Sequence, residues 1–320
     1  MTRFIVRRLL LSLVTLGIIL VLITLIPNLA PGDPARKIAG GTASPERLMA
    51  VRESLGLDKS ILEQLRDTAT AVFTFDFGES FTRPGFSVSE LVLSALGNSA
   101  RLVAFALVLV LPISILGGVV AARRRDTWLD RTIVNTGVAL SSLPEFVVGV
   151  LFLALLAVPI EFFKVIADPP DGASVLVQMQ FLMLPALTVL VVYFGYIARI
   201  TRASTIENLS ADYTRTAYMK GLSTQQVFRK HVLRNALVPT VAVIGTQLGY
   251  MFGGMVGLEL IYNFPGLGRL IFDAVDAADY PLLRGGVLTV AIIYMVATLA
   301  ADLMIAWMNP RARLALSEAA

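Results

Sequence analysis

Apolar residues gather in long continuous runs that short polar segments separate. A helix that crosses a hydrocarbon core of ~30 Å needs about 20 mostly apolar residues, and six runs have roughly this length. They predict membrane-spanning helices over residues 9–26, 100–122, 132–158, 181–200, 238–260 and 285–307. The first run follows Arg3, Arg7 and Arg8, as a secretion signal would, but it is too long for one and lacks a clear A-x-A cleavage site. We therefore expect an all-α integral membrane protein with six transmembrane helices, the first of them retained.

The composition supports this interpretation. Hydrophobic residues make up 56% of the 320 residues and charged residues only 16%, and the mean hydropathy is +0.75. An ordinary soluble domain is less apolar. The net charge of +4 is scattered between apolar runs and forms no continuous basic face, so a lipid membrane rather than nucleic acid is the expected partner. The chain has no cysteine and a single histidine, His231, which excludes a disulfide framework and a histidine cluster; no metal site is expected.

The basic residues predict the orientation, because short cytoplasmic loops carry the excess of Lys and Arg. One set of loops holds most of them, at positions 3, 7, 8, 123–125, 131, 199, 202, 215, 220, 229, 230, 234, 311 and 313. The short loops of the other side hold only Lys164, Arg269 and Arg284. Both termini are therefore expected in the cytoplasm.

The orientation leaves one long segment, 28–98, outside the cytoplasm. Within it Ser44 can cap a helix whose first residue is Pro45, and Gly56 can end that helix. We expect a small folded cap there, with an extended loop as the alternative. The predicted organisation is a cytoplasmic N-terminus and first helix (1–27), the cap segment (28–98), a core of five helices (99–307) and a cytoplasmic tail (308–320).

Recognisable catalytic motifs are absent from the sequence. It contains no G-x-x-x-x-G-K-[ST] phosphate loop, no H-E-x-x-H zinc motif and no G-x-S-x-G nucleophile elbow. Acidic residues inside apolar runs are costly and so are candidates for function. Glu145, near the middle of the third run, could line a polar pathway or could be buried beside a polar partner. Glu259 and Asp302 lie near the ends of runs, where we expect them to extend to the membrane interface.

The most polar and basic stretch of the second half lies at 212–239, within a cytoplasmic segment expected over 201–237. Ser210 or Asp212 can cap a short helix that continues through Lys220. Gly221 can then supply a positive φ that ends this helix, with Leu222 packed at the corner. Ser223 and Gln226 match a capping box that starts a second helix. The pattern predicts helix, glycine corner, helix.

This predicted corner has two kinds of face. In its second helix Val227, Phe228, His231 and Val232 recur at helical spacing, while Arg229, Lys230 and Arg234 point elsewhere. An apolar ridge with a basic rim could rest on anionic lipid or fit a groove on a soluble protein. The tight turn favours the protein groove, because binding to lipid needs only one flat amphipathic helix.

At this segment the chain resembles the inner-membrane permease subunits of ATP-binding-cassette (ABC) importers, in particular the dipeptide, oligopeptide and nickel group. The signature of that family is E-A-A, three residues, G, and later an I-x-L-P-like end. Here it falls on Arg215, Thr216 and Ala217, on Gly221, and on residues 231–234. Arg215, Thr216 and Arg234 depart from the general signature, but D-Y-x-R-T-A-x-x-K-G-L-S is the form typical of the peptide and nickel branch.

Further motifs of this family occur in order along nearly the whole chain. They are RRLL (7–10), PGDPA (31–35), LGLDKS (55–60), DFGES (76–80), DTWLDR (126–131), SLPEF (142–146), LPALT (184–188), ARITRAS (198–204), FPGLGRL (264–270) and DYP (279–281). The resemblance implies a type I importer permease fold in a bacterial inner membrane. It also implies a chain that forms half of a translocation pathway and carries no catalytic residues or cofactor of its own.

The resemblance implies a set of partners. They are a second homologous permease subunit, two cytoplasmic ATPase subunits that bind ATP and Mg, an extracytoplasmic solute-binding protein and a peptide substrate. The candidate ATPase-coupling residues are Asp212, Arg215, Thr216, Ala217, Gly221, Leu222, Ser223, Phe228 and His231. Glu145 is the candidate for the substrate pathway, and the candidates for contact with the binding protein are Phe264, Pro265, Gly266 and Gly268, whose alternative role is local turn geometry.

Several functions stay open at this point. Peptides of different length, nickel chelates, glutathione or another small solute all fit this branch, because a shared scaffold does not determine the cargo. A proton-coupled carrier or a membrane enzyme that uses Glu145 is the alternative from a different class.

Overall fold

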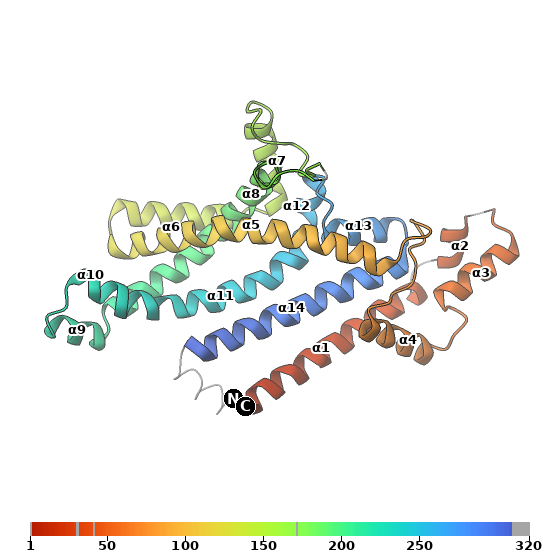
Figure 1. The fold of residues 1–320 in the computed structure, drawn as a ribbon, viewed down its shortest axis with the longest axis horizontal. Coiled ribbons are helices and arrows are strands. Elements are labelled where there is room, and N and C mark those ends of the chain that lie inside the picture. The colour runs from red at the N-terminus through yellow and green to blue at the C-terminus, as the bar shows by residue number, and fades with distance from the viewer. Residues whose placement is uncertain (1, 30–31, 41, 171, 309–320) are drawn as a thin grey trace.

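The long apolar runs form long helices (Figure 1). A computed structural model describes residues 2–29, 32–40, 42–170 and 172–308. The helices long and apolar enough to cross a membrane are α1 (Thr2–Leu29), α5 (Val88–Arg123), α8 (Val175–Leu209), α11 (Leu233–Gly254) and α14 (Tyr280–Met308). They correspond to five of the predicted spans. The predicted tail 308–320 lies outside the described residues except for Met308.

The third predicted span is not one straight helix. It consists of α6 (Trp128–Ser141) and α7 (Glu145–Phe152), and a π-helical turn, η1 (Leu153–Ala157), continues α7. The two parts meet at an angle of 101°, and α7 rises out of the bundle (Figure 1). Pro144 explains the break, because proline has no N–H to donate and disfavours a helical conformation of the residue before it. The prediction of a continuous helix over 132–158 was therefore wrong, and Glu145 begins a helix instead of lying in the middle of one.

Helix α5 starts earlier than predicted. It contains 36 residues, which corresponds to about 54 Å and exceeds the thickness of a hydrocarbon core. Val88 and Val92 are fully buried in a cluster with Leu267 and Leu288, so this apolar contact stabilises the additional turns. Residues 88–98 of the predicted cap segment thus belong to α5.

The segment between α1 and α5 folds into a small cap. Its helices are α2 (Pro34–Ala39), α3 (Pro45–Leu55) and α4 (Ile61–Thr74). The predicted cap of α3 is confirmed, since Ser44 accepts a hydrogen bond from the Arg47 amide and Gly56 ends the helix with φ 67°. Beside it, a hydrogen bond from Arg52 holds the pKa of Asp33 below its usual range.

The cap packs on the core through a small apolar cluster. Ala35 and Leu55 of the cap contact Ala278 and Tyr280, at the start of α14. A compact cap is therefore present, rather than an extended loop.

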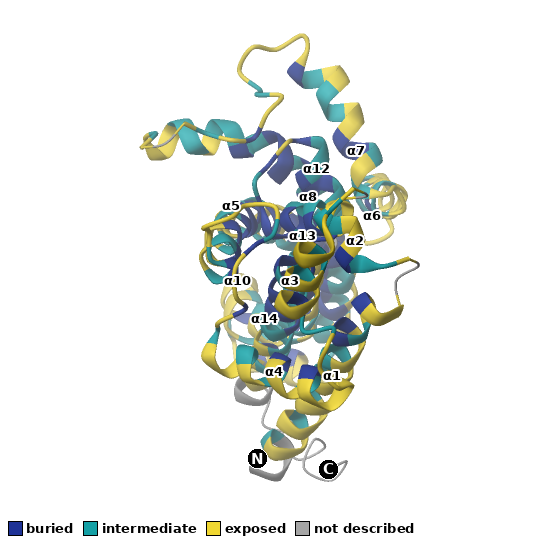
Figure 2. Ribbon diagram, turned by 90° about the vertical axis from the view of Figure 1, so that its right-hand side faces the viewer, coloured by how far each residue is buried: buried dark blue, intermediate teal, exposed yellow. Residues whose placement is uncertain are grey.

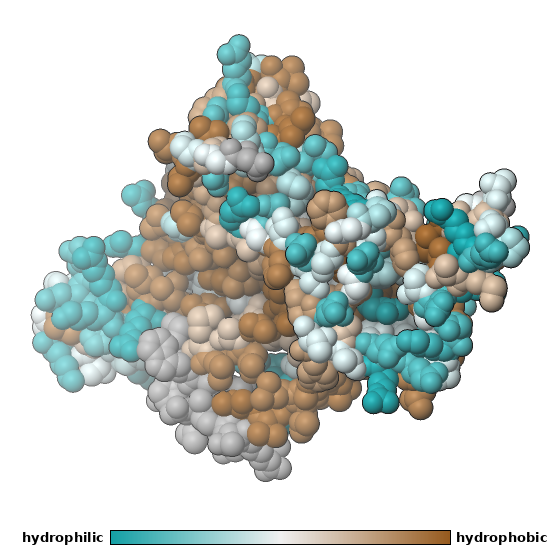
Figure 3. Space-filling view, turned by 45° about the vertical axis from the view of Figure 1, so that its right-hand side comes forward, coloured by the Kyte–Doolittle hydropathy of each residue, from teal (hydrophilic) through white to brown (hydrophobic). Residues whose placement is uncertain are grey.

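Short helices occupy the two ends of the bundle. At one end lie α9 (Asp212–Met219), α10 (Thr224–Val227) and the π-helical turn η2 (Phe228–Val232). Toward the other end, α12 (Val256–Ile261) and α13 (Leu267–Asp276) follow α11. Figure 3 shows apolar side chains over the middle of the molecule and polar side chains over α9–α10 and over the cap. This distribution is the one expected of a membrane-spanning bundle whose two ends are exposed to water.

Helix α1 lies at the edge of the bundle. Many of its apolar side chains are exposed (Figure 2), including Leu10, Val14, Ile18 and Leu22, as expected for a lipid-facing helix. Near its start Arg8 forms an ion pair of 2.8 Å with Asp302 of α14. Asp302, which we expected to extend to the membrane interface, thus pairs with a basic residue of the neighbouring helix.

The centre of the bundle is formed by α5, α8, α11 and α12. Its largest fully buried side chains include Leu102, Leu184, Met251, Leu258 and Tyr262. Glycines permit the closest helix contacts: a Cβ on Gly195 of α8 would lie 2.0 Å from the carbonyl oxygen of Gly137 in α6. Small residues at such crossings allow the helix–helix packing that holds membrane bundles together.

Candidate functional site

Residues 212–232, named here the basic corner, form the turn between α8 and α11. The structure confirms the positive φ predicted for Gly221, which follows α9 with φ 78°. It also confirms the capping box, in which the Ser223 hydroxyl accepts from the Gln226 amide and the Gln226 side chain accepts from the Ser223 amide. The local sequence thus determines both the stop and the restart of the helix.

Three details of the predicted corner were wrong. The cap of α9 is Ala211, which makes no side-chain hydrogen bond; the Ser210 hydroxyl donates back to the Ile206 carbonyl oxygen, and Asp212 is already the first helical residue. The helix also ends at Met219 rather than Lys220. The second helix is not a separate element, because α10, η2 and α11 follow one another without a break. The corner is therefore a rigid extension of a membrane-spanning helix.

The candidate coupling residues divide between two faces of the corner. Ala217 is buried, and Leu222 and Phe228 pack with it against Val227 and Val232. His231 is half-buried, while the exposed candidates are Asp212, Arg215, Thr216, Gly221 and Ser223. Beside the exposed candidates, the large exposed side chains are Tyr213, Tyr218 and Met219. One face thus holds the corner together and the other is free for a partner.

The corner also contacts the end of α5. The guanidinium carbon of Arg123 lies 4.9 Å from the centroid of the Phe228 ring, an arrangement that attracts the cation to the aromatic face. Phe228 is therefore held between the apolar cluster of the corner and a neighbouring helix.

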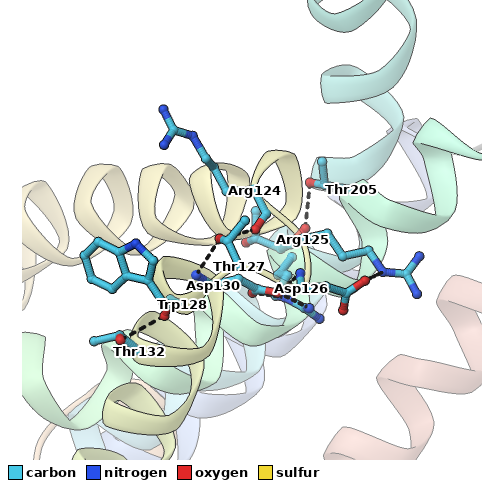
Figure 4. A network of polar contacts seen from close by, with 10 residues as sticks. Arg124, Arg125, Asp126, Thr127, Trp128, Asp130, Thr132 and Thr205 are labelled. Carbon is cyan, nitrogen blue, oxygen red and sulfur yellow. Dashed lines mark hydrogen bonds and ion pairs between the residues drawn. The ribbon is translucent and has the colours of Figure 1, made fainter.

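An ion pair that the sequence analysis did not single out lies near this end of the bundle. Arg202 of α8 donates two hydrogen bonds to the Asp130 carboxylate of α6, at 2.5 and 2.6 Å. The Asp130 side chain is 3% exposed and also accepts a bond of 2.9 Å from the Asp126 amide. Figure 4 shows this turn between α5 and α6 with Thr205 of α8 beside it. The motifs DTWLDR and ARITRAS contained both partners, but nothing in the sequence indicated that they meet.

At the opposite end Glu259 is buried, with 1% of its surface exposed. The interpretation that it extends to the membrane interface was therefore wrong. Its carboxylate accepts hydrogen bonds from the Ser99 hydroxyl at 2.6 Å and from the Arg269 amide at 2.9 Å. The Ser99 oxygen in turn accepts from the Leu267 amide at 2.8 Å. These bonds satisfy free amides at the start of α13 and join it to α5 and α12.

Glu259 also explains the glycines of the FPGLGR turn. A Cβ on Gly266 would lie 2.1 Å from the Glu259 carboxylate, and one on Gly268 would lie 3.0 Å from it. Phe264, Gly266 and Gly268 are buried and Pro265 is half-buried. Their residue types thus follow from local packing, and any side-chain contact of this turn with a partner would involve Pro265 and its more exposed neighbours.

A third buried carboxylate, Asp279, joins two motifs that are far apart in the sequence, since its partner Ser80 lies 199 residues before it. Asp279, at the start of α14, accepts bonds from the Ser80 hydroxyl at 2.6 Å and from the amide and hydroxyl of Thr82 at 3.0 and 2.8 Å. It also accepts from the Leu282 amide at 3.1 Å. The motifs DFGES and DYP therefore meet in one anchor between the cap segment and the core.

Glu145 is half-buried at the start of α7. Helix α7 is held in place by Tyr262, the residue that follows α12, whose hydroxyl donates to the Gly149 carbonyl oxygen at 3.3 Å and pairs with the Thr188 hydroxyl at 2.8 Å. Among the residues that the structure describes, no three His, Cys, Asp or Glu side chains gather in a group that could hold a metal ion.

Known proteins resemble this chain over almost its full length. Residues 114–314 match the family described as binding-protein-dependent transport system inner membrane component, and residues 1–89 match the N-terminal family of such components. The glutathione transport system permease protein GsiC of Salmonella typhimurium is 36% identical, over 98% of this chain and 99% of the relative. A putative peptide transport system permease protein of Brucella abortus is 35% identical over the same shares.

A third relative is a probable peptide ABC transporter permease protein of Sinorhizobium fredii, which is 35% identical over 97% of this chain and 99% of its own length. Sequence similarity to these relatives thus extends over almost the whole chain, which includes the helical bundle, the broken third span and the basic corner. The chain belongs to the binding-protein-dependent transport system inner membrane components, the permease subunits of ABC importers.

Proposed function

We propose that this protein forms half of the translocation pathway of an ATP-driven importer of peptides. Two of the relatives above carry a peptide transport name and the third a glutathione transport name, and glutathione is itself a short peptide. Nickel chelates, glutathione or another small solute are the alternative cargo. The chain itself has no catalytic role in this proposal.

The main support for the proposal is the structure of the basic corner. Its buried face and capping box make it stiff, while α9 presents Asp212, Arg215 and Thr216 to the outside together with Tyr213 and Tyr218. Exposed aromatic and charged side chains on a short rigid element are typical of a docking surface. We assign this face to a cytoplasmic ATPase subunit, with both termini of the chain in the cytoplasm as the basic loops predict.

The remaining partners are a second homologous permease, a second ATPase subunit and a solute-binding protein that delivers the cargo from outside. Transport requires contacts that differ between two states of the complex. The corner would transmit the closure of the ATPase subunits, which bind ATP and Mg, to the spans. The cap and the turn at 263–269 face the opposite end, where the binding protein would dock.

Purification of the tagged chain with the products of its neighbouring genes tests this proposal. We expect an ATPase to co-purify, and its activity in lipid vesicles to rise when the binding protein carries a peptide. Uptake of peptide without any ATPase, or a complex whose ATP hydrolysis ignores the loaded binding protein, would contradict it.

Gly221→Val is expected to uncouple the ATPase while the chain still inserts into the membrane. At φ 78° nothing lies within 4 Å of a Cβ at this position, so the penalty comes from the backbone alone, about 1–2 kcal/mol. Stimulated ATP hydrolysis should fall several-fold. Gly221→Asn is the matched control, because asparagine tolerates this conformation; it should stay close to wild type. Wild-type uptake by Gly221→Val would remove Gly221 from the mechanism.

A second candidate function, a proton-coupled carrier, is favoured only by the position of Glu145. Interrupted helices with an acidic residue at the break are a feature of carrier binding sites. Glu145→Gln distinguishes the two functions. If the chain is an importer permease, uptake driven by ATP persists and only the preference among substrates shifts. Loss of all uptake in the variant, with wild-type uptake that depends on a proton gradient, would support the carrier.

A further inference from the structure

The basic corner is firmly joined to α8, as shown by bonds at the α8–α9 turn. The Thr214 hydroxyl donates to the Asn208 carbonyl oxygen at 2.7 Å, and the Tyr213 hydroxyl donates to the Asn208 side chain. Thr214 is buried with 1% exposure. A displacement of α9 must therefore move the end of α8 with it.

Helix α6 packs along α8, and two of the contacts between them are especially close. The first is the pair of hydrogen bonds from Arg202 to Asp130, which has a fixed, two-pronged geometry. The second is the crossing of Gly137 and Gly195, where the backbones touch. Helix α6 is thus held to α8 near its start and in its middle, and its other end is the break before Glu145.

The same region of α8 is packed tightly on α5. A Cβ on Gly118 would lie 2.5 Å from the Ala198 carbonyl oxygen and 3.1 Å from the Arg202 amide. Because Asp130 also accepts from the Asp126 amide, the ion pair fixes the turn between α5 and α6 as well as the start of α6. Arg202 is therefore the point at which α5, α6 and α8 meet.

We infer that the Asp130–Arg202 ion pair is a positioning joint that passes the movement of the basic corner to α6, and so to the broken third span. This inference rests on the proposed function and adds a route for the movement to a specific span. A buried pair costs free energy to desolvate, so its value for stability alone is small. Its two-pronged geometry instead fixes the angle between two helices, which a transmitted movement requires.

The test uses the complete transporter in lipid vesicles and measures the ratio of ATP hydrolysis with and without loaded binding protein. Asp130→Asn keeps the size of the side chain and an acceptor for the Asp126 amide but removes the charge. Arg202→Lys keeps the charge but not the two-pronged contact. We expect either change to lower the ratio about fivefold or more, with the ATPase still bound to the complex.

A matched control removes an exposed ion pair in the same turn. Arg125 and Asp126 pair at 3.3 Å with more than half of each side chain exposed (58% and 77%), and such pairs contribute little. Asp126→Asn keeps the backbone amide that donates to Asp130 and should leave the ratio unchanged. A wild-type ratio in both Asp130→Asn and Arg202→Lys would overturn the inference but leave the proposed function intact. A wild-type complex without stimulated hydrolysis would overturn the proposed function itself.

Cross-linking provides a rescue that a purely structural role would not show. The chain contains no cysteine, so Asp130→Cys with Arg202→Cys introduces its only two thiols. A short bis-methanethiosulfonate cross-linker, which forms a disulfide with each thiol and releases sulfinate, should restore the ratio, and reduction of these disulfides should lower it again. If the cross-link raises thermal stability but leaves the ratio low, the pair is only structural and the inference is wrong. If the double variant does not accumulate in the membrane, the hydrolysis ratio of Arg202→Lys tests the inference instead.

Discussion

Gly195→Val is expected to prevent normal assembly of the bundle. A Cβ at this position would lie 2.0 Å from the Gly137 carbonyl oxygen and 2.7 Å from the Ser141 hydroxyl. The first contact is with backbone, so α6 and α8 would have to separate. Overpacking of a tight site costs about 1–3 kcal/mol and more where nothing can yield. The amount of protein in the membrane should fall several-fold, and the thermal midpoint of the purified protein should drop.

Gly17→Val is the matched control, since it makes the same change within a long apolar helix. No atom lies within 4 Å of a Cβ on Gly17, and α1 is at the edge of the bundle. Equal amounts and equal thermal midpoints for the two variants would show that the close contact of α6 with α8 is not needed.

Glu259→Leu is expected to loosen the turn at 263–269 and the start of α13. Leucine leaves the Arg269 amide and the Ser99 hydroxyl without their buried acceptor, at a cost of about 1–3 kcal/mol for each group. Hydrogen exchange of the Arg269 amide should become markedly faster, and the thermal midpoint should fall. Stimulation of ATP hydrolysis by the loaded binding protein should fall with them if this turn forms part of its docking site.

Glu259→Gln separates charge from hydrogen bonding. Its carbonyl oxygen can still accept from the Arg269 amide, and its amide nitrogen can donate to the Ser99 oxygen. We therefore expect a much smaller effect than that of leucine. Unchanged amide exchange at Arg269 in Glu259→Leu would show that the carboxylate does not hold this turn.

Local patterns in the sequence were sufficient for most of the long helices and for the basic corner. A spanning helix must match the thickness of the membrane, so the length of an apolar run is enough to identify it. Five of the six predicted spans are single helices in the structure. The corner at Gly221 and the capping box at Ser223 involve neighbouring residues and needed no tertiary contact. The break in the third span was not predicted, although Pro144 marks it in the sequence. Proline within a long apolar run is often tolerated in membrane helices, so its presence alone did not indicate a break.

The site followed from the sequence only in part. The coupling candidates were identified from one continuous segment, but their division into a packed face with Ala217 and an exposed face with Arg215 depends on how η2 and the end of α5 pack. The polar anchors were missed altogether. Asp130 with Arg202, Ser99 with Glu259, and Ser80 with Asp279 are far apart along the chain, and each residue by itself is indistinguishable from a solvated polar side chain.

The amino-acid sequence was enough to predict a bundle of membrane-spanning helices with a basic corner, because hydrophobic length, charge bias and helix caps act over short distances. Which carboxylates are buried, and which helices they join, depends on the packing of the helices. A buried charge is tolerated only when specific donors surround it, and those donors come from helices that folding brings together. For that reason Glu259 and Asp130 join helices here, although nothing around either residue in the sequence indicates its partner.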